Sequence, residues 1–104
     1  MSDYPHKLDL ERIRTWDCKQ PRQWLADCED TWNMDFGTWT TEILPTGVIT
    51  VSCATGGWSG NEDIIDAMQG NSALWALTWS GSRRGGRYDF EIVGDNAVFE
   101  DRKD

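Results

Sequence analysis

The stretch Ala54–Glu62 constrains the fold of this chain more than any other, because it joins a glycine-rich turn to a strong helix start. The pair Gly56–Gly57 permits positive φ angles or the close approach of another chain segment. Ser59 and Glu62 fit the S-x-x-E capping box, in which each side chain satisfies a backbone N–H of the other residue. We therefore predict a tight turn followed by a helix over residues 60–69.

The predicted helix has one apolar face, formed by Ile64, Ile65 and Met68. Gly70 is a suitable end, because glycine accepts the left-handed conformation that closes many helices. The acidic residues at its beginning are favoured by the positive end of the helix dipole. They would also repel a phosphate, which disfavours anion binding at this helix start.

The sequence of the first thirty residues predicts helical structure that is interrupted at Pro21. Apolar residues at helical spacing predict a helix over Leu8–Lys19 and a second over Pro21–Asp30. Proline is tolerated in the first turn of a helix but not in its interior. Two helices are therefore favoured, although one longer helix stays open.

The central part of the chain alternates as strands do. Trp32–Phe36 and Trp39–Ile43 alternate with opposite parity, which indicates a bulge or turn near Gly37. Pro45–Gly47 is a tight connection to a further strand, Val48–Cys53. These segments predict a β-hairpin.

A second hairpin is predicted after the helix. Ala73–Ser80 alternates and is apolar on much of both faces, so we predict a central strand there. Gly81–Gly86 is a turn, Arg87–Ile92 is a half-buried strand, and Ala97–Phe99 is a short edge strand.

The predicted fold class is α+β. An antiparallel sheet of two hairpins, with four or more strands, packs on one central helix beside an N-terminal helical section. The length of 104 residues predicts one domain, 1–104, with loose ends at 1–5 and 100–104. Hydrophobic residues make up only 38% of the chain, but seven tryptophans supply large buried surfaces for a core.

The net charge of −8 argues against direct nucleic-acid binding, because the phosphates of a nucleic acid are bound by basic side chains. No Lys or Arg occurs between Trp32 and Ser82, whereas the central helix carries Glu62, Asp63 and Asp66. We therefore predict that these three carboxylates bind a basic surface of a partner. That partner would be a host protein or a protein–nucleic-acid complex.

The compartment follows from the cysteines and the N-terminus. Cys18, Cys28 and Cys53 form neither a C-x-x-C pair nor a zinc pattern, and we expect reduced thiols with Cys53 buried. No apolar run is long enough to span a membrane, and Met1–Tyr4 opens no signal peptide. We expect a soluble, cytoplasmic protein without membrane contact. The sequence does not indicate an oligomeric state.

Residues that could support catalysis are few. His6 is the only histidine, and no phosphate-binding loop, zinc-protease or calcium-loop motif occurs. We assign no catalytic residue, no metal ligand and no cofactor. An enzyme of unknown type that uses Asn61, Glu62 and the arginines is a remaining alternative.

The glycine loop and the arginine turn provide an alternative binding site for a small ligand. Arginine forks bind phosphate or carboxylate groups, and tryptophan supplies a flat apolar wall. A nucleotide or another anion is the expected ligand. The site residues would be Gly57, Trp58, Ser59, Asn61, Trp79, Arg83 and Arg84. The alternative is a purely structural turn, in which the arginines pair with the acidic residues of the helix or are solvated.

The runs Thr55–Ile65 and Ser82–Phe90, with Trp75 and Trp79 between them, resemble segments of small uncharacterised bacteriophage proteins. The resemblance covers about Trp39 to Ile92. It implies a phage or prophage origin and the cytoplasm of an infected bacterium. It also implies that the glycine loop and the arginine turn form one site. An acidic, non-enzymatic inhibitor similar in kind to anti-CRISPR proteins is the first functional hypothesis.

Overall fold

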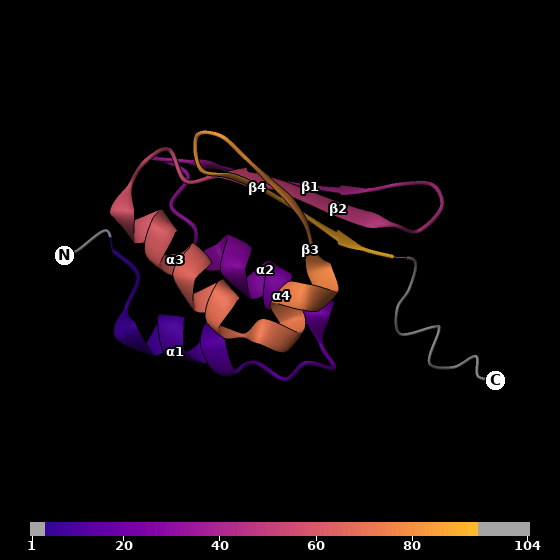
Figure 1. Cartoon of the computed structure of the whole chain (residues 1–104), viewed down its shortest axis with the longest axis horizontal. Helices are drawn as coiled ribbons and strands as arrows, with labels where there is room; N and C mark the ends of the chain where they lie inside the picture. Colours follow the sequence, from indigo (N-terminus) through magenta and orange to yellow (C-terminus); the bar gives the residue numbers. More distant parts are fainter. Residues whose placement is uncertain (1–3, 94–104) are drawn as a thin grey trace.

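The computed structural model describes residues 4–93, and Figure 1 shows a sheet lying over a layer of helices. The fold is α+β, as the sequence predicts, with four helices and four antiparallel strands in the described residues. The elements in chain order are α1 (Lys7–Thr15), α2 (Pro21–Thr31), β1 (Thr38–Ile43), β2 (Ile49–Ala54), α3 (Ser59–Gly70), α4 (Ser72–Thr78), β3 (Trp79–Arg83) and β4 (Arg87–Ile92).

The sheet joins two hairpins side by side in the order β1-β2-β4-β3. In the first hairpin Thr41 lies opposite Val51, and the connecting turn uses Gly47 at a φ of 92°. Val51 in turn lies opposite Phe90, so the hairpins meet through an antiparallel β2–β4 pair. The helices α3 and α4 carry the chain across the sheet to its far edge, where β3 pairs with β4.

The core lies between the sheet and the helices. Alternation places Ile49, Val51 and Cys53 of β2 on the inner face, beside Phe90 and Ile92 of β4. This confirms both predicted strands, including the half-buried character of β4. From the helices the core receives Ile13, Trp24, Leu25, Cys28, Ile64, Ile65, Ala67, Met68 and Leu74.

The N-terminal section forms two helices, with Pro21 in the first turn of α2 as predicted. The first helix ends at Thr15 rather than Lys19. The reason is local, because the Asp17 carboxylate accepts the Lys19 N–H at 2.9 Å and the Asp17 carbonyl accepts the Gln20 N–H. These side-chain and turn bonds compete with helix continuation.

The prediction of a central strand over Ala73–Ser80 is wrong. Most of this segment is α4, and only its last two residues begin β3, which is an edge strand. Asn71 starts the helix, because its side chain accepts the Leu74 N–H at 3.3 Å. Leu74 and Thr78 then point to the core at a spacing of four residues, which the alternating pattern does not reveal.

The prediction of a strand over Trp32–Phe36 is also wrong. Asn33 forms a turn there: its carbonyl accepts the N–H groups of Phe36 and Gly37, and its side chain accepts the Asp35 N–H. Trp32 is buried, whereas Phe36 is exposed. An asparagine turn therefore replaces the expected strand pairing.

The N-cap and the C-cap of α3 differ from the predicted ones. The N-cap is Trp58, and no side chain caps the first turn, so Ser59 and Glu62 form no capping box. The Ser59 hydroxyl lies 2.9 Å from the Tyr4 hydroxyl instead. The helix does end at Gly70, but Gly70 is helical and the C-cap is Asn71 at a φ of −93°. Asn71 serves as the end of α3 and the start of α4, which removes the need for a left-handed glycine.

The predictions for Ala97–Phe99 and for the tail 100–104 lie outside the described residues, as does that for residues 1–3. Tyr4 belongs to the described part and packs on the start of α3. Within residues 4–93, none of the helices has the length and apolarity to cross a membrane.

Candidate binding surface

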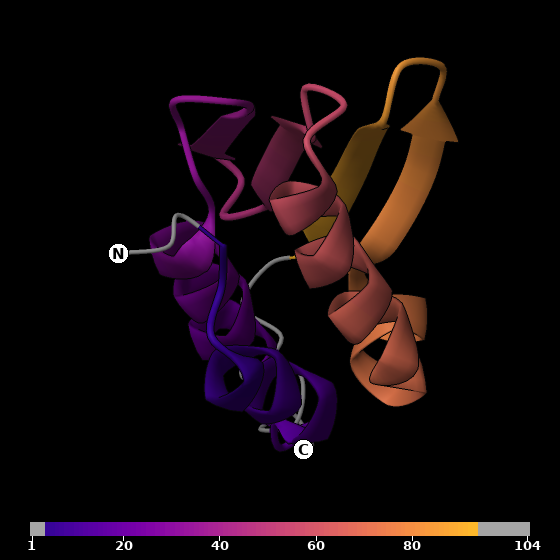
Figure 2. The same ribbon diagram turned by 90° about the vertical axis from the view of Figure 1, so that its left-hand side faces the viewer.

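Three loops meet at one end of the sheet: residues 33–37, 55–58 and 84–86 (Figure 2). The Thr55 N–H donates to the Gly86 carbonyl at 3.0 Å, which joins the glycine loop to the arginine turn. Gly86 also packs on the Thr55 side chain so closely that a Cβ would overlap it. The structure therefore places the two predicted halves of the alternative site side by side.

The buried side chain of Asn61 connects two of these loops. Its Oδ1 accepts the Asn33 N–H at 3.0 Å, and its Nδ2 donates to the Asn33 carbonyl at 3.1 Å. The same Nδ2 donates to the Thr55 carbonyl at 3.4 Å. Asn61 is 0% exposed, so its amide holds backbone and is not available on the surface.

The glycine loop is compact because two residues in it adopt positive φ. Gly56 has a φ of 70°, and a Cβ there would overlap the Phe36 carbonyl. Gly57 has a φ of 76°, and its N–H donates to the Thr55 hydroxyl at 3.2 Å. This confirms the positive φ angles expected of the glycine pair, and it brings Phe36 against the loop.

Three partly exposed rings, Tyr4, Phe36 and Trp58, form what we call the aromatic cluster. Trp58 joins the other two: its ring stacks on Phe36 at a centroid distance of 4.6 Å and meets Tyr4 at 4.8 Å. Tyr4 is 50% exposed and Phe36 is 45% exposed. The Trp58 ring also covers Gly60, where a Cβ would overlap it.

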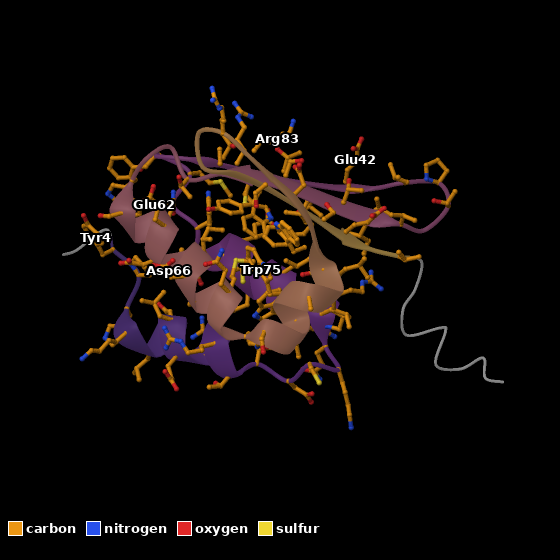
Figure 3. The ribbon with its side chains drawn as sticks, in the orientation of Figure 1. Tyr4, Glu42, Glu62, Asp66, Trp75 and Arg83 are labelled. Atoms are coloured by element: carbon orange, nitrogen blue, oxygen red, sulfur yellow. The ribbon has the colours of Figure 1, made fainter. Side chains whose placement is uncertain are left out.

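Glu62, Asp63 and Asp66, which we call the α3 carboxylates, are exposed on the helix that follows the aromatic cluster. Figure 3 shows Glu62 and Asp66 on α3 near Tyr4. In residues 4–93, none of the three forms an ion pair, and only Glu62 accepts a side-chain hydrogen bond, a long one from Thr55 at 3.5 Å. Their negative charge is therefore directed to solvent.

The arginines and Trp79 do not gather around Trp58. Arg83 lies on the outer face of the sheet, where it pairs with Asp89 at 3.1 Å (Figure 3). Trp79 lies at the opposite end of β3 from the turn, stacked on Trp75. Arg84 is exposed in the turn and has no ion pair with the described residues.

The remaining reactive side chains have structural roles. His6 caps α1, because its Nδ1 accepts the Leu8 N–H at 3.1 Å. Cys28 and Cys53 are buried free thiols, and burial raises the pKa of both, for Cys53 to about 12. Among the described residues, no group of three or more His, Cys, Asp or Glu side chains is placed to hold a metal ion.

A small apolar pocket of about 180 Å³ lies elsewhere, between α2 and the inner face of the sheet. Leu25, Ile43, Ile49 and Ile92 form its walls, and Arg22 and Glu29 also line it. None of the residues predicted to bind a ligand or partner lines this pocket.

Sequence reasoning missed Tyr4 and Phe36. Tyr4 lies in a segment predicted to be loose, and Phe36 was expected to belong to a strand. Their contacts with Trp58 join distant parts of the chain, so no local periodicity predicts them. The nearest signal was the glycine pair, which indicates that some other chain segment approaches this loop.

No protein-family model matches the chain, and neither a curated protein nor a solved structure does. The resemblance of Thr55–Ile65 and Ser82–Phe90 to bacteriophage proteins stays a prediction. The feature that bears on function is therefore the surface itself, an aromatic cluster beside unpaired carboxylates.

Proposed function

We propose that the chain is a non-enzymatic, phage-type accessory protein that binds a basic surface of a host macromolecule in the bacterial cytoplasm. The observation that supports this proposal is the set of α3 carboxylates, which project from the exposed face of the helix without a cationic partner in residues 4–93. A partner that supplies Lys or Arg side chains would complete these interactions. The phage origin is supported by the sequence resemblance alone.

The distribution of charge supports the same proposal. Arg12, Arg14 and Arg83 are already engaged in ion pairs with carboxylates that lie outside α3. The α3 carboxylates are excluded from these pairs, and the whole chain carries a charge of −8. Such a surface attracts a basic partner over a long range and is screened by salt.

The class of partner follows from this charge. Basic protein surfaces of this kind bind nucleic acid, so an acidic protein that covers one competes with the nucleic acid. We therefore propose that the host partner is a protein or complex that handles nucleic acid. The mode of action is inhibition by occupation, similar in kind to that of anti-CRISPR proteins.

The experiment compares two charge-neutralising double variants against the same partner. The partner is identified by affinity capture from expressing bacteria and then purified, and association rates are measured over a series of salt concentrations. Asp63→Asn with Asp66→Asn should slow association and flatten its salt dependence. Glu42→Gln with Glu91→Gln is the matched control, because it removes the same charge from the outer face of the sheet. Equal effects of the two variants would show that net charge, not the α3 surface, controls binding.

A second candidate, a small anion held between the glycine loop and the arginine turn, is favoured by the Thr55–Gly86 hydrogen bond. Against it, Arg83 is paired with Asp89, and Phe36 and Gly60 pack on the Trp58 ring. The test is calorimetry with ATP and with inorganic phosphate. This candidate predicts that Arg83→Gln with Arg84→Gln abolishes binding, whereas the variant of Asp63 and Asp66 retains it.

A further inference from the structure

We infer that the aromatic cluster is the short-range anchor of this surface and that it receives an arginine side chain of the partner. This inference rests on the proposed function, because it uses the same face of α3. It goes beyond it in naming the chemical group that is recognised and the residues that recognise it.

The rings and the charges form one continuous surface. The Tyr4 hydroxyl bonds the Ser59 hydroxyl at 2.9 Å. Ser59, Asp63 and Asp66 are spaced four and then three residues apart, so they share one face of α3. Tyr4 therefore lies at the end of the same stripe that carries two carboxylates, and a single side chain can reach a ring and a carboxylate together.

The rings are also held in place before binding. The Trp58 ring fills the space that a Cβ at Gly60 would need, and the Phe36 carbonyl does the same at Gly56. Asn61 fixes the turn that carries Phe36 through two bonds to Asn33. A rigid surface loses little conformational entropy on binding, and aromatic side chains on such surfaces dominate interface energies.

Charge complementarity selects the group that binds to this surface. Exposed aromatic faces attract cations, and the neighbouring carboxylates attract the same charge. Arginine fits both features better than lysine, because its planar guanidinium stacks on a ring while its N–H groups fork to a carboxylate. Two other occupants are disfavoured by charge repulsion. A nucleic acid would place phosphates beside Glu62, Asp63 and Asp66, and a second copy of the chain would bring another charge of −8.

The test uses an oligo-arginine peptide and an oligo-lysine peptide of equal length as probes. Binding is measured by calorimetry at low salt and by NMR of the indole N–H signals, with Trp58→Phe to assign the Trp58 signal. The wild-type chain should bind the arginine peptide about two- to fivefold more tightly, as expected for an exposed cation–π contact. The Trp58 signal should shift more with arginine than with lysine.

Variants separate the rings from the charges. Phe36→Leu keeps an apolar side chain without a π face, so it should lower the arginine-to-lysine affinity ratio, and the Tyr4 and Trp58 rings account for the preference that remains. Phe36→Tyr should keep the wild-type ratio. Asp63→Asn with Asp66→Asn should weaken the binding of both peptides, and that of the arginine peptide at least as much, because the forked bonds to a carboxylate are lost as well.

Each alternative result has one meaning. A wild-type ratio that survives in Phe36→Leu overturns the arginine anchor but leaves the proposed function standing. The arginine-to-lysine ratio could instead depend on Phe36 while the affinities of both peptides are unchanged by Asp63→Asn with Asp66→Asn. That result would contradict the proposed role of the α3 carboxylates. No binding of either peptide, stronger binding of an oligo-thymidine strand, or self-association that Phe36→Leu abolishes would each overturn the anchor.

Discussion

The amide side chain of Asn61 forms hydrogen bonds with both backbone polar groups of Asn33. It accepts the Asn33 N–H at 3.0 Å and donates to the Asn33 carbonyl at 3.1 Å. One buried amide on α3 thereby fixes the turn between α2 and β1, which carries Phe36. The position of the aromatic cluster depends on this relationship, because Trp58 precedes α3 and Phe36 follows Asn33.

Replacement of Asn61 should loosen this end of the molecule. Asn61→Ala leaves the Asn33 N–H without its acceptor and removes one of the two bonds to the Thr55 carbonyl. An unsatisfied buried polar group costs about 1–3 kcal/mol. Urea unfolding should report that loss as a lower midpoint with an unchanged slope. Gln69→Ala, an exposed change on the same helix, is the control and should have little effect. Equal midpoints for the two variants would contradict the bonds described for Asn61.

Gly60 and Gly70 should respond differently to the same substitution, although both are helical. A Cβ at Gly60 overlaps the Trp58 ring, so Gly60→Ala should destabilise the fold by about 1–3 kcal/mol through overpacking. At Gly70 the Cβ meets only the flexible Arg14 side chain at 3.1 Å. Gly70→Ala should therefore be neutral, or stabilise by up to about 1 kcal/mol. Thermal unfolding of both variants tests this, and a stabilising Gly60→Ala would show that Trp58 does not cover this position.

Asn71, the observed N-cap of α4, and Ser59, the predicted cap of α3, should differ in what their replacement costs. Asn71 accepts the Leu74 N–H and donates to the carbonyls of Ile13 and Trp16, so Asn71→Ala removes a cap and two bonds between helices. We expect a loss of about 2–4 kcal/mol from these combined effects. Ser59→Ala should cost less than about 0.5 kcal/mol, as is usual at an exposed site that caps nothing. Chemical denaturation of both variants checks the order, and a larger cost for Ser59→Ala would restore it as the cap.

The three cysteines should react at very different rates. Cys18 is exposed, whereas burial raises the pKa of Cys28 and Cys53, the latter to about 12. Because the thiolate is the reactive form, iodoacetamide at pH 8 should label Cys18 first, and Cys18→Ser should remove the fast phase. Rapid labelling of Cys53 in the folded chain would contradict its burial.

The same pKa shifts predict a loss of stability at alkaline pH. The folded state holds both thiols neutral, so their contribution is fully present below the ordinary thiol pKa. It is lost as pH rises through the raised values in the folded state. The unfolding free energy of Cys18→Ser should therefore fall above about pH 9, where unfolded thiols ionise. Cys53→Ala, measured in the same background, should show a weaker fall.

Several features of the fold follow from local chemistry and could be predicted. The alternation of β2 and β4 identifies their buried faces, because side chains of a strand point to opposite sides in turn. Pro21 marks the start of α2, because proline has no N–H for a helix interior. Gly56–Gly57 marks a turn with positive φ angles. The exposed positions of Asp63 and Asp66 follow from the spacing of the apolar residues of α3.

The tertiary structure alone decided the conformation of residues 73–80 and the composition of the binding surface. Apolar residues at 74, 75, 77 and 79 fit a strand by alternation and a helix by spacings of four, so the pattern cannot choose. The choice depends on Asn71, whose bonds to Ile13 and Trp16 of the N-terminal section place the start of α4. Tyr4 and Phe36 reach Trp58 in the same way, through contacts between segments far apart in the chain. Local periodicity reports which side of an element is buried, and only the packed structure decides what covers it.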